Sequence, residues 1–402
     1  MTKLPQGWEW KSLDEICEIV MGQSPNGNCI FNKDKNKDLI EFHQGKIAFS
    51  DKYINKSDFV TSDIRKIAKK NSVVLSVRAP VGEVNITSED IAIGRGLCSI
   101  NGIKINNEFL FFYLLTLKKY FNDNSTGSTF KAISTKIIKE TKIPLPPLKE
   151  QERIVGILDE SFAKIDESIK ILEQDLLNLD ELMQSALQKA FNPLKDNAKE
   201  NYKLPQGWEW KSLEEISEIN PRNKIDDNIN VSFISMDKIL DGYSNDFSYK
   251  VKKWKEVKKG FTHFKQGDIG VAKITPCFEN RKSVIFDKLE NGFGAGTTEL
   301  HIIRANESVY SKFLLWFFKT EWFIQNGILN MTGATGHKRI SKDFIKSLQI
   351  PLPPLKEQEQ IASHLDELSS HVKNLKQNYQ AQIKDLQELK NSLLDKAFKG
   401  NL

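Results

Sequence analysis

The chain has 402 residues, 39% of them hydrophobic and 10% aromatic, which is enough for two or three packed domains and excludes a disordered protein. The N-terminus lacks the apolar segment of a signal peptide, and the longest apolar run, at 109–117, is too short to cross a bilayer. The four cysteines form no CxxC pair, which argues against a disulfide scaffold or a thiolate zinc site. We therefore expect a cytoplasmic protein with no membrane partner.

Positive charge is concentrated in two parts of the chain. The whole chain carries a net charge of +5, but residues 1–147 and residues 201–347 each carry +5, and residues 148–191 carry −5. A polyanion would bind the two basic blocks. The alternative interpretation is that +5 for each block is ordinary surface charge.

The first half of the chain alternates short extended and helical patterns. An extended entry at 5–10 leads into a helix-like turn at 12–16. Short β-rich runs such as 72–77 follow, with Gly and Asn between them. An apolar helical stretch at 109–121 and a Gly/Ser/Thr turn at 125–134 complete this half. The pattern predicts a mixed α and β domain.

A long helix follows the sequence Pro-Leu-Pro-Pro at 144–147, which is stiff and extended because proline fixes its own φ and restricts the residue before it. Apolar residues alternate in steps of three and four from Val155 to Ala190, the period that keeps a seam facing a partner helix. In the second half of the chain, apolar residues repeat every seven positions from Leu365 to Leu393. Each helix should have roughly 40 residues and a length of about 60 Å.

These two helices most simply pair with each other, since one chain carries both seams. The predicted seam residues are Leu158, Ile165, Leu172, Leu179, Leu365, Val372, Tyr379 and Leu386.

The chain is a tandem duplication. The decapeptide LPQGWEWKSL occurs at 4–13 and at 204–213, an offset of 200 residues, and IPLPPLKEQE occurs at 143–152 and at 350–359, an offset of 207. The sequence between these matches has diverged. We interpret the chain as two copies of one structural unit. The repeated motifs form a constant frame, and the diverged sequences between them hold different ligands. Neutral drift after duplication is the alternative, but drift would also have eroded the frame.

The sequence offers no recognisable catalytic centre. It has no GxxxxGK[ST] phosphate loop, no GxSxG nucleophile elbow and no histidine pair at metal-ligand spacing. His337 lies in a basic turn, where contact with an anion is more plausible than metal ligation. We therefore expect a binding protein without a metal.

Two divergent blocks, each opened by P-x-G-W-x-W and closed by T-G-[SA]-T, I-S and I-P-L-P-P-L-x-E-Q before a long helix, resemble the specificity subunit of type I restriction-modification systems. The resemblance covers essentially the whole chain. It implies an α+β fold in which two globular α/β target recognition domains are joined by two long antiparallel helices that form a coiled coil, with a pseudo-two-fold internal repeat.

The resemblance also sets expected domain boundaries. The first target recognition domain is expected at 1–147 and the second at 201–350. The central long helix with its linker is expected at 148–200, and the C-terminal long helix at 351–402.

The same resemblance implies a non-catalytic subunit that recognises a bipartite double-stranded DNA target. It implies that two methyltransferase subunits and the restriction motor-nuclease subunits dock on the chain. Those partners would use S-adenosylmethionine, ATP and Mg to modify adenine at N6 and to cleave DNA, and this chain would hold no cofactor itself. The competing hypothesis is a non-enzymatic coiled-coil scaffold with two ligand-binding domains, which explains neither the matched basic blocks nor the motifs.

Recognition would fall to turns in the two blocks, where phosphate contacts give affinity and contacts to base edges give sequence. The resemblance cannot assign base contacts to single positions, because these blocks are variable in the family. For every candidate the alternative is a solvated surface side chain. The candidates are Lys46, Arg78, Arg95 and Lys131 in the first block, and Lys273, Arg281, Lys282, His337, Lys338 and Arg339 in the second.

Overall fold

The chain packs into two compact units. The computed structural model describes residues 4–36, 38–127, 131–192, 204–334 and 336–402. Unit 1 consists of Met1–Ile171 and Ala381–Leu402, and unit 2 consists of Leu172–Gln380. Each long helix therefore begins in one unit and ends in the other. The boundaries of these two units differ from those of the four segments expected from the sequence, at 1–147, 148–200, 201–350 and 351–402.

The repeated decapeptides form the same substructure in both units. In each, the strand that opens the block pairs antiparallel with the strand that closes it, with Glu9 opposite Leu145 and Glu209 opposite Leu352. A one-turn helix follows the opening strand and begins with a capping box, Ser12 with Glu15 or Ser212 with Glu215. These elements are β1 (Glu9–Ser12), α1 (Leu13–Ile16) and β11 (Lys142–Leu145), and β12 (Glu209–Ser212), α7 (Leu213–Ile216) and β21 (Gln349–Leu352).

Each unit also contains a four-stranded antiparallel sheet whose strand order is the same in both copies. In unit 1 the order is β2 (Cys17–Met21), β10 (Leu97–Gly102), β7 (Val73–Ser76) and β8 (Val84–Ile86). In unit 2 it is β13 (Ser217–Ile219), β20 (Leu300–Ala305), β17 (Ile269–Ala272) and β18 (Ser283–Ile285).

A second, mixed sheet in each unit is built around one parallel pair of strands. In unit 1 the order is β3 (Ile30–Asn32), β5 (Phe59–Thr61), β4 (Ile40–His43), β9 (Ile91–Ile93) and β6 (Ile67–Ala68). In unit 2 it is β15 (Lys250–Lys253), β14 (Asn230–Ile234), β19 (Phe293–Gly296) and β16 (Thr262–Lys265). The parallel pairs are β4 with β9 and β14 with β19, so the two units share this arrangement although their sequences differ, and β3 is an additional strand of unit 1.

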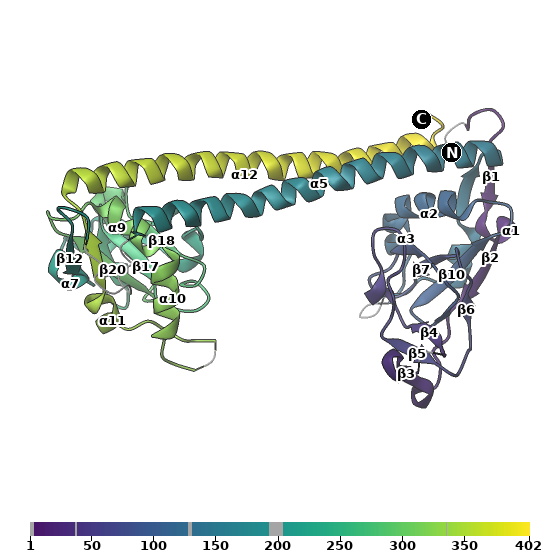
Figure 1. Ribbon diagram of the computed structural model, residues 1–402, viewed down its shortest axis with the longest axis horizontal. Helices are drawn as coiled ribbons and strands as arrows, with labels where there is room; N and C mark the ends of the chain where they lie inside the picture. The colour runs from purple at the N-terminus through teal and green to yellow at the C-terminus, as the bar shows by residue number, and fades with distance from the viewer. Residues whose placement is uncertain (1–3, 37, 128–130, 193–203, 335) are drawn as a thin grey trace. The chain divides into compact units, whose positions relative to one another are not determined.

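Short helices cover the sheets. One of these helices follows the last strand of the four-stranded sheet. It is apolar on all sides because it is buried on all sides, as at Phe109–Leu114. It lies between that sheet and the long helices (Figure 1). The short helices are α2 (Asn107–Thr116), α3 (Lys118–Asp123) and α4 (Thr135–Glu140) in unit 1, and α8 (Trp254–Val257), α9 (Ser311–Phe318), α10 (Glu321–Leu329) and α11 (Lys342–Ser347) in unit 2.

The long helices α5 (Leu148–Ala190) and α12 (Leu355–Phe398) have 43 and 44 residues. A buried glutamine fixes the start of each. Gln151 Oε1 accepts a bond of 2.8 Å from Asn106 N, and Gln151 Nε2 donates to Pro146 O at 2.9 Å. Gln358 makes the matching bonds to Tyr310 N and Pro353 O, both 2.8 Å.

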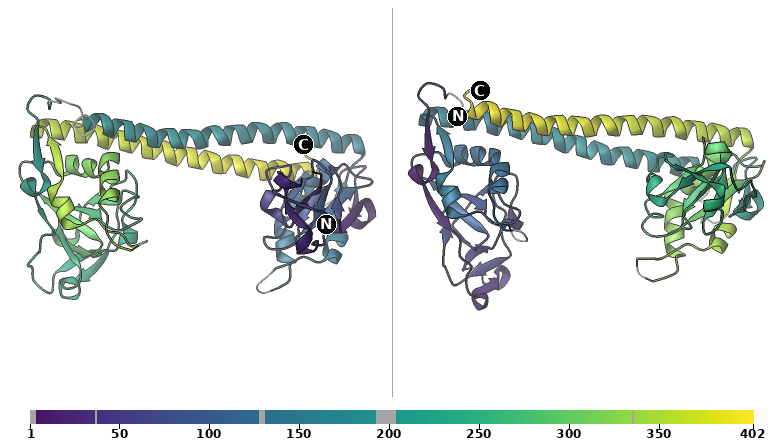
Figure 2. Two further views of the ribbon diagram at one scale, coloured as in Figure 1. Left: turned by 60° about the horizontal axis from the view of Figure 1, so that its bottom comes forward. Right: turned by 180° about the vertical axis from the view of Figure 1, so that it is seen from behind.

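Within each unit the two long helices lie beside each other (Figure 2). In unit 1, Lys390 pairs with Asp166, and Arg153 Nη2 donates to Leu402 O at 3.1 Å, so the helices are antiparallel. In unit 2, Lys376 Nζ lies 2.6 Å from Asp180 Oδ1. The α+β class, the internal repeat and the antiparallel helices are confirmed, whereas a supercoiled coiled coil stays a prediction.

The predicted seam residues lie inward on these helices. Leu158, Ile165, Leu179, Leu365 and Val372 are buried, and Leu172, Tyr379 and Leu386 are half-buried. By contrast Ile171, Leu177, Leu375 and Leu389 are exposed on the same helices.

We expect Leu158→Ala to lower the free energy of unfolding of unit 1 by about 2–5 kcal/mol, because its fully buried side chain would leave a cavity in the core. Urea unfolding followed by circular dichroism measures the change. The matched control is Ile171→Ala on the same helix, whose exposed side chain should change stability by no more than about 0.5 kcal/mol. Equal effects of the two substitutions would contradict the packing described here.

Candidate nucleic-acid interface

Five loops of unit 1 meet at one end of its sheets and are joined by backbone hydrogen bonds. Gly94 N donates to His43 O at 2.8 Å, and Val77 N donates to Gly96 O at 2.9 Å. Gln23 N also donates to Ile93 O, at 3.0 Å. We call this surface the first rim, and it consists of residues 22–26, 43–48, 77–83, 94–96 and 131–132.

The first rim brings together the four candidates of the first block. Arg78, Arg95 and Lys131 are exposed, and Ala79 N donates to Lys131 O at 3.1 Å, which holds two of these loops together. Lys46 is half-buried, and its Nζ lies 3.3 Å from Glu83 Oε1.

Glu83 organises a further cation that the sequence reasoning missed. Lys118 Nζ lies 2.9 Å from Glu83 Oε1, next to Lys46. Burial works against ionisation of Glu83, but Lys118 and Lys46 lower its pKa overall. One carboxylate thus holds two lysines at the rim. No spacing in the sequence connects positions 83 and 118, so only the fold reveals this group.

The loops of the first rim approach each other closely at Gly94-Arg95-Gly96. A Cβ on Gly96 would lie 2.5 Å from Gln44 O, and one on Gly94 would collide with the Gln44 side chain. Glycine is therefore required on both sides of Arg95, and this tight contact fixes the Arg95 backbone on the rim.

Unit 2 contains an equivalent surface. Thr275 N donates to Lys338 O at 3.1 Å, which matches the bond from Ala79 to Lys131 in unit 1. Lys273 N donates to Glu299 O at 3.0 Å, and Thr297 N donates to Ile234 O at 3.1 Å. We call this surface the second rim, and it consists of residues 234–238, 272–282, 297–299 and 337–340. It contains all six candidates of the second block.

Two arginines of the second rim are engaged within the protein. Arg339 makes a bidentate ion pair with Glu299, with both N–O distances 2.9 Å, and this guanidinium lowers the pKa of Glu299. Arg281 is only 17% exposed, pairs with Glu321 and donates from Nε to Lys319 O at 3.2 Å. These side chains therefore hold loops in place in the structure described here.

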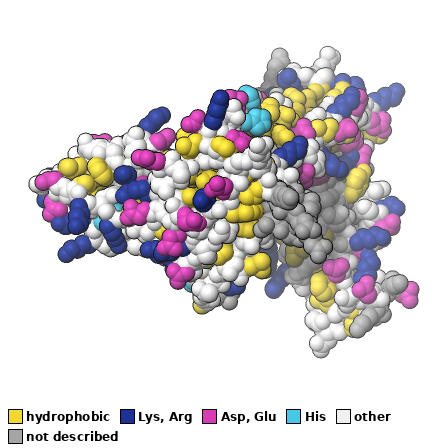
Figure 3. All heavy atoms as spheres, turned by 60° about the vertical axis from the view of Figure 1, so that its left-hand side comes forward, with side chains coloured by type: hydrophobic (Ala, Val, Ile, Leu, Met, Phe, Trp, Pro, Cys, Tyr) yellow, Lys and Arg dark blue, Asp and Glu magenta, His cyan; other side chains and the backbone are white. Residues whose placement is uncertain are grey.

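The remaining candidates of the second rim differ in their exposure. His337 and Lys338 are exposed, and Lys273 is half-buried. Lys282 Nζ donates to Met236 O at 3.3 Å. The exposed charge of this rim thus lies mainly in the turn before Arg339. On the face drawn in Figure 3, basic and acidic side chains are intermixed.

Lys319 is a buried cation beneath the second rim that sequence reasoning also missed. Its Nζ donates to three backbone carbonyls, those of Gly242 at 2.8 Å, Ser283 at 3.0 Å and Arg281 at 3.3 Å. Burial lowers the pKa of Lys319 to about 7, and the charge of Arg281 acts in the same direction. This residue ties the Gly242 loop to the segment that carries Arg281.

Two cysteines of unit 1, Cys17 and Cys98, are buried. Burial raises the pKa values of Cys17 and Cys98 to about 12, so both remain thiols at neutral pH. Among the residues described, no cluster of three or more His, Cys, Asp or Glu side chains could hold a metal ion. Within the same residues, every helix is too short or too polar to cross a membrane.

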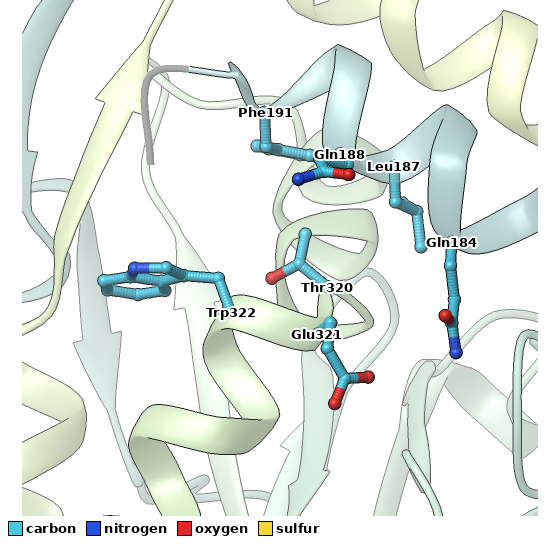
Figure 4. A pocket seen from close by; sticks show the side chains of 7 residues that line it. All are labelled: Gln184, Leu187, Gln188, Phe191, Thr320, Glu321 and Trp322. Carbon is cyan, nitrogen blue, oxygen red and sulfur yellow. The ribbon is translucent and has the colours of Figure 1, made fainter. Parts of the chain in front are cut away.

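One pocket of unit 2 lies between the end of α5 and the start of α10 (Figure 4). Its carboxylate, Glu321, is already bound by Arg281 and by Gln325 Nε2 at 2.7 Å. The pocket therefore presents an apolar surface with amide groups and no unengaged acid. Its lining residues are Gln184, Leu187, Gln188, Phe191, Thr320, Glu321 and Trp322.

The family model described as type I restriction modification DNA specificity domain matches residues 5–176 and 205–385. The two matches cover most of the chain. The chain belongs to this family. Each match of the type I specificity family begins at the proline of a repeated decapeptide and extends into a long helix, so the two rims lie in separate matches.

Several named relatives belong to type I restriction enzymes. The chain is 43% identical over 218 residues to the EcoAI specificity subunit of Escherichia coli, across 53% of this chain and 37% of that protein. It is 35% identical over 187 residues to the putative MjaX specificity subunit of Methanocaldococcus jannaschii, across 44% of this chain and 43% of that one. The match thus spans less than half the length of these relatives.

Solved structures share the fold along the whole chain. The HsdS subunit from Thermoanaerobacter tengcongensis superposes with a TM-score of 0.59 at 21% identity, covering 100% of this chain and 99% of that one. A chain from a structure of the type I R-M system superposes with a TM-score of 0.79 at 21% identity, covering 100% of both chains. These likenesses concern the fold alone.

We expect the stability of unit 2 to rise with pH above about 7 through Lys319. In the unfolded chain a lysine holds its proton up to about pH 10.4, so between the two pKa values the unfolded state binds more protons and the folded state gains stability. The gain should reach up to about 1.4 kcal/mol per pH unit. Urea unfolding at pH 7, 8 and 9 measures it, with Lys319→Met as the control that should lack this slope. Parallel curves for the two proteins would show that Lys319 stays charged in the fold.

Proposed function

We propose that the chain is the DNA sequence-specificity subunit of a type I restriction-modification complex and that each rim reads one half of a bipartite double-stranded DNA target. One observation carries the proposal: a chain of the type I specificity family presents two divergent rims on one repeated frame. The repeated frame explains how one subunit can hold two rims that differ in amino-acid sequence. The divergence of the rims explains why the two half-sites would differ.

The exposed cations of both rims support this proposal. Exposed lysines and arginines neutralise phosphates and give affinity, while amides and guanidiniums on base edges give sequence. In the first rim, Arg78, Arg95 and Lys131 are exposed for such contacts. In the second rim, Lys338 and His337 are exposed. In this proposal the chain is not itself an enzyme, and partner subunits use S-adenosylmethionine, ATP and Mg to methylate adenine at N6 and to cleave DNA.

Two sets of identical exposed residues support the docking of two copies of one partner. We call them the frame patches. Their residues are exposed in both units and occupy matching positions in the repeated decapeptides. They are Gln6, Glu9, Leu148, Lys149 and Glu152 in unit 1, and Gln206, Glu209, Leu355, Lys356 and Glu359 in unit 2.

The two segments of each frame patch lie together. In unit 2, a Cβ on Gly207 would lie 3.3 Å from Pro354, and Trp208 Nε1 donates to Glu357 Oε1 at 3.2 Å. Leu148 is 57% exposed and Leu355 is 45% exposed. Packing explains identity between copies at buried positions, but it does not explain identity at exposed ones. A shared ligand does, and we propose one methyltransferase subunit at each patch, with the restriction motor-nuclease subunits joining the same complex.

Exchange of one block tests the proposed reading of DNA. The chain is co-expressed with its cognate methyltransferase, and methylated adenines are mapped across the genome. Replacing residues 1–147 by the block of another family member should change one half of the methylated motif and leave the other half intact, because the second rim is untouched. Methylation without a sequence motif, or a swap that changes both halves or neither, would favour the scaffold hypothesis.

Substitution of the exposed leucines tests the frame patches. Leu148→Ser or Leu355→Ser alone should leave one strong methyltransferase site for each chain, and the double variant should leave none. Burial of one leucine at an interface is worth about 1.5–3 kcal/mol, so each altered site should bind roughly tenfold to hundredfold more weakly.

Native mass spectrometry and calorimetry give the stoichiometry and the affinities of these complexes. Ile171→Ser is the control, because Ile171 is 56% exposed on α5 but lies outside the patch. Retention of two methyltransferases by the double variant would refute docking at the frame patches.

A further inference from the structure

The most exposed hydrophobic side chain of the residues described lies on the first rim. Ile47 has 101% of its reference exposure, so its whole side chain is in water. It sits in the middle of a 3-10 turn, η3 (Lys46–Ala48), directly after β4 and its rim loop. Exposure of an isoleucine side chain to water is unfavourable. A ligand that covered Ile47 would remove this apolar surface from water and would gain binding free energy.

The turn that carries Ile47 is held firmly. Phe49 N donates to Lys46 O at 2.9 Å, and Asn55 N donates to Ala48 O at 2.8 Å. On the other side, Gln44 O accepts a bond of 3.2 Å from Gly96 N. The position of Ile47 is therefore set by bonds on both sides of it, so little ordering would be needed when a ligand binds.

The neighbours of Ile47 have the chemistry of a nucleic-acid contact. Lys46 precedes it, and Arg95 is exposed on the adjoining loop. The Gln44 side chain accepts a bond of 3.0 Å from Ser24 Oγ, so its amide is oriented at the same place. An apolar group among cations and an amide matches a DNA groove, where thymine presents its C5-methyl group among hydrogen-bonding groups and phosphates lie alongside.

The second rim has no such side chain at the equivalent turn. That turn is η4 (Met236–Lys238), which follows β14 as η3 follows β4. Met236 is partly buried and packs against the core of unit 2 that contains Phe264 and Phe286. An apolar contact to the ligand at this turn is therefore a property of the first rim.

We infer that Ile47 contacts the C5-methyl group of a thymine in the major groove of the first half-site. The inference rests on the proposed function and adds one of the groups by which the first rim reads sequence. It requires only that the Ile47 side chain and one methyl group leave water together on binding.

The test is a thermodynamic cycle between the protein and the DNA. The chain with its cognate methyltransferase is titrated with a duplex that carries the methylated motif, and with duplexes in which each thymine of a half-site is replaced in turn by uracil. At one thymine of the first half-site, loss of the methyl group should weaken binding about fourfold, the effect of one buried methyl group. For Ile47→Ala, the same replacement should have no effect, because the partner of the methyl group is already missing.

Ile103→Ala is the matched control. Ile103 is 68% exposed in the same unit, but it follows β10 at the end away from Gly96, and its backbone N bonds to Ile16 O. Binding of this variant should depend on thymine as the unsubstituted chain does. Equal melting temperatures of the three proteins would show that neither substitution disturbs the fold.

The outcomes separate this inference from the proposed function. If the unsubstituted complex binds no DNA specifically, the proposed function fails. If it does, but no uracil replacement weakens binding, or Ile47→Ala keeps the full uracil effect, the thymine contact is wrong. Bending of the duplex that is lost in Ile47→Ala, without a uracil effect, would identify an inserted wedge in place of a methyl contact and would also overturn the inference.

Discussion

The antiparallel ladder between the first and last strands of each block is the interaction on which the rest of the structure depends. β1 pairs with β11, and β12 pairs with β21, in the same register. Each ladder joins residues more than a hundred positions apart and so closes a large loop of chain. The buried Gln151 and Gln358 then attach the start of each long helix to the helix that covers the sheet. Whatever lies between the two strands begins and ends at one place.

This closure separates what must stay constant from what can vary. The ladder, the capping boxes and the glutamines are built from residues that recur in both copies. The loops that form the rims start and end on strands that pair in the same order in both units, so the fold sets the positions of these loops while their sequences differ. The first rim relies on glycines around Arg95, whereas the second has Thr297, Thr298 and Glu299 in the corresponding segment and closes it with Arg339.

Much of the fold follows from the sequence because its signals are periodic or repeated. The heptad spacing marks both long helices, and the predicted seam residues from Leu158 to Leu386 are all buried or half-buried. Spacing alone does not say how deeply the partner helix covers each position. Leu375 and Leu389, three residues after Val372 and Leu386, are exposed. The grouping of the candidates on two rims agrees with their place in turns of the blocks.

Ion pairs and buried charges could not be predicted from the sequence. The pairing of Arg281 with Glu321 and of Arg339 with Glu299 depends on the fold, because partners forty positions apart carry no local signal. The same holds for Lys319. In the sequence it follows an apolar helical stretch, where a lysine is expected to be exposed to solvent. Its ammonium instead reaches three carbonyls in the interior, a role that depends on where two distant loops come together.

The closed ladder has a consequence for chain length. The two opening decapeptides are 200 residues apart and the two closing decapeptides are 207 apart, so the second block is seven residues longer than the first. The strand ladders that close the two blocks nevertheless have the same register. The entropy of closing a loop grows only with the logarithm of its length, by about 0.6 kcal/mol for each doubling. Insertions of several residues into either block therefore cost almost nothing at the ladder. New binding surfaces can arise by adding or removing chain as readily as by substitution, while the strands that hold them remain unchanged.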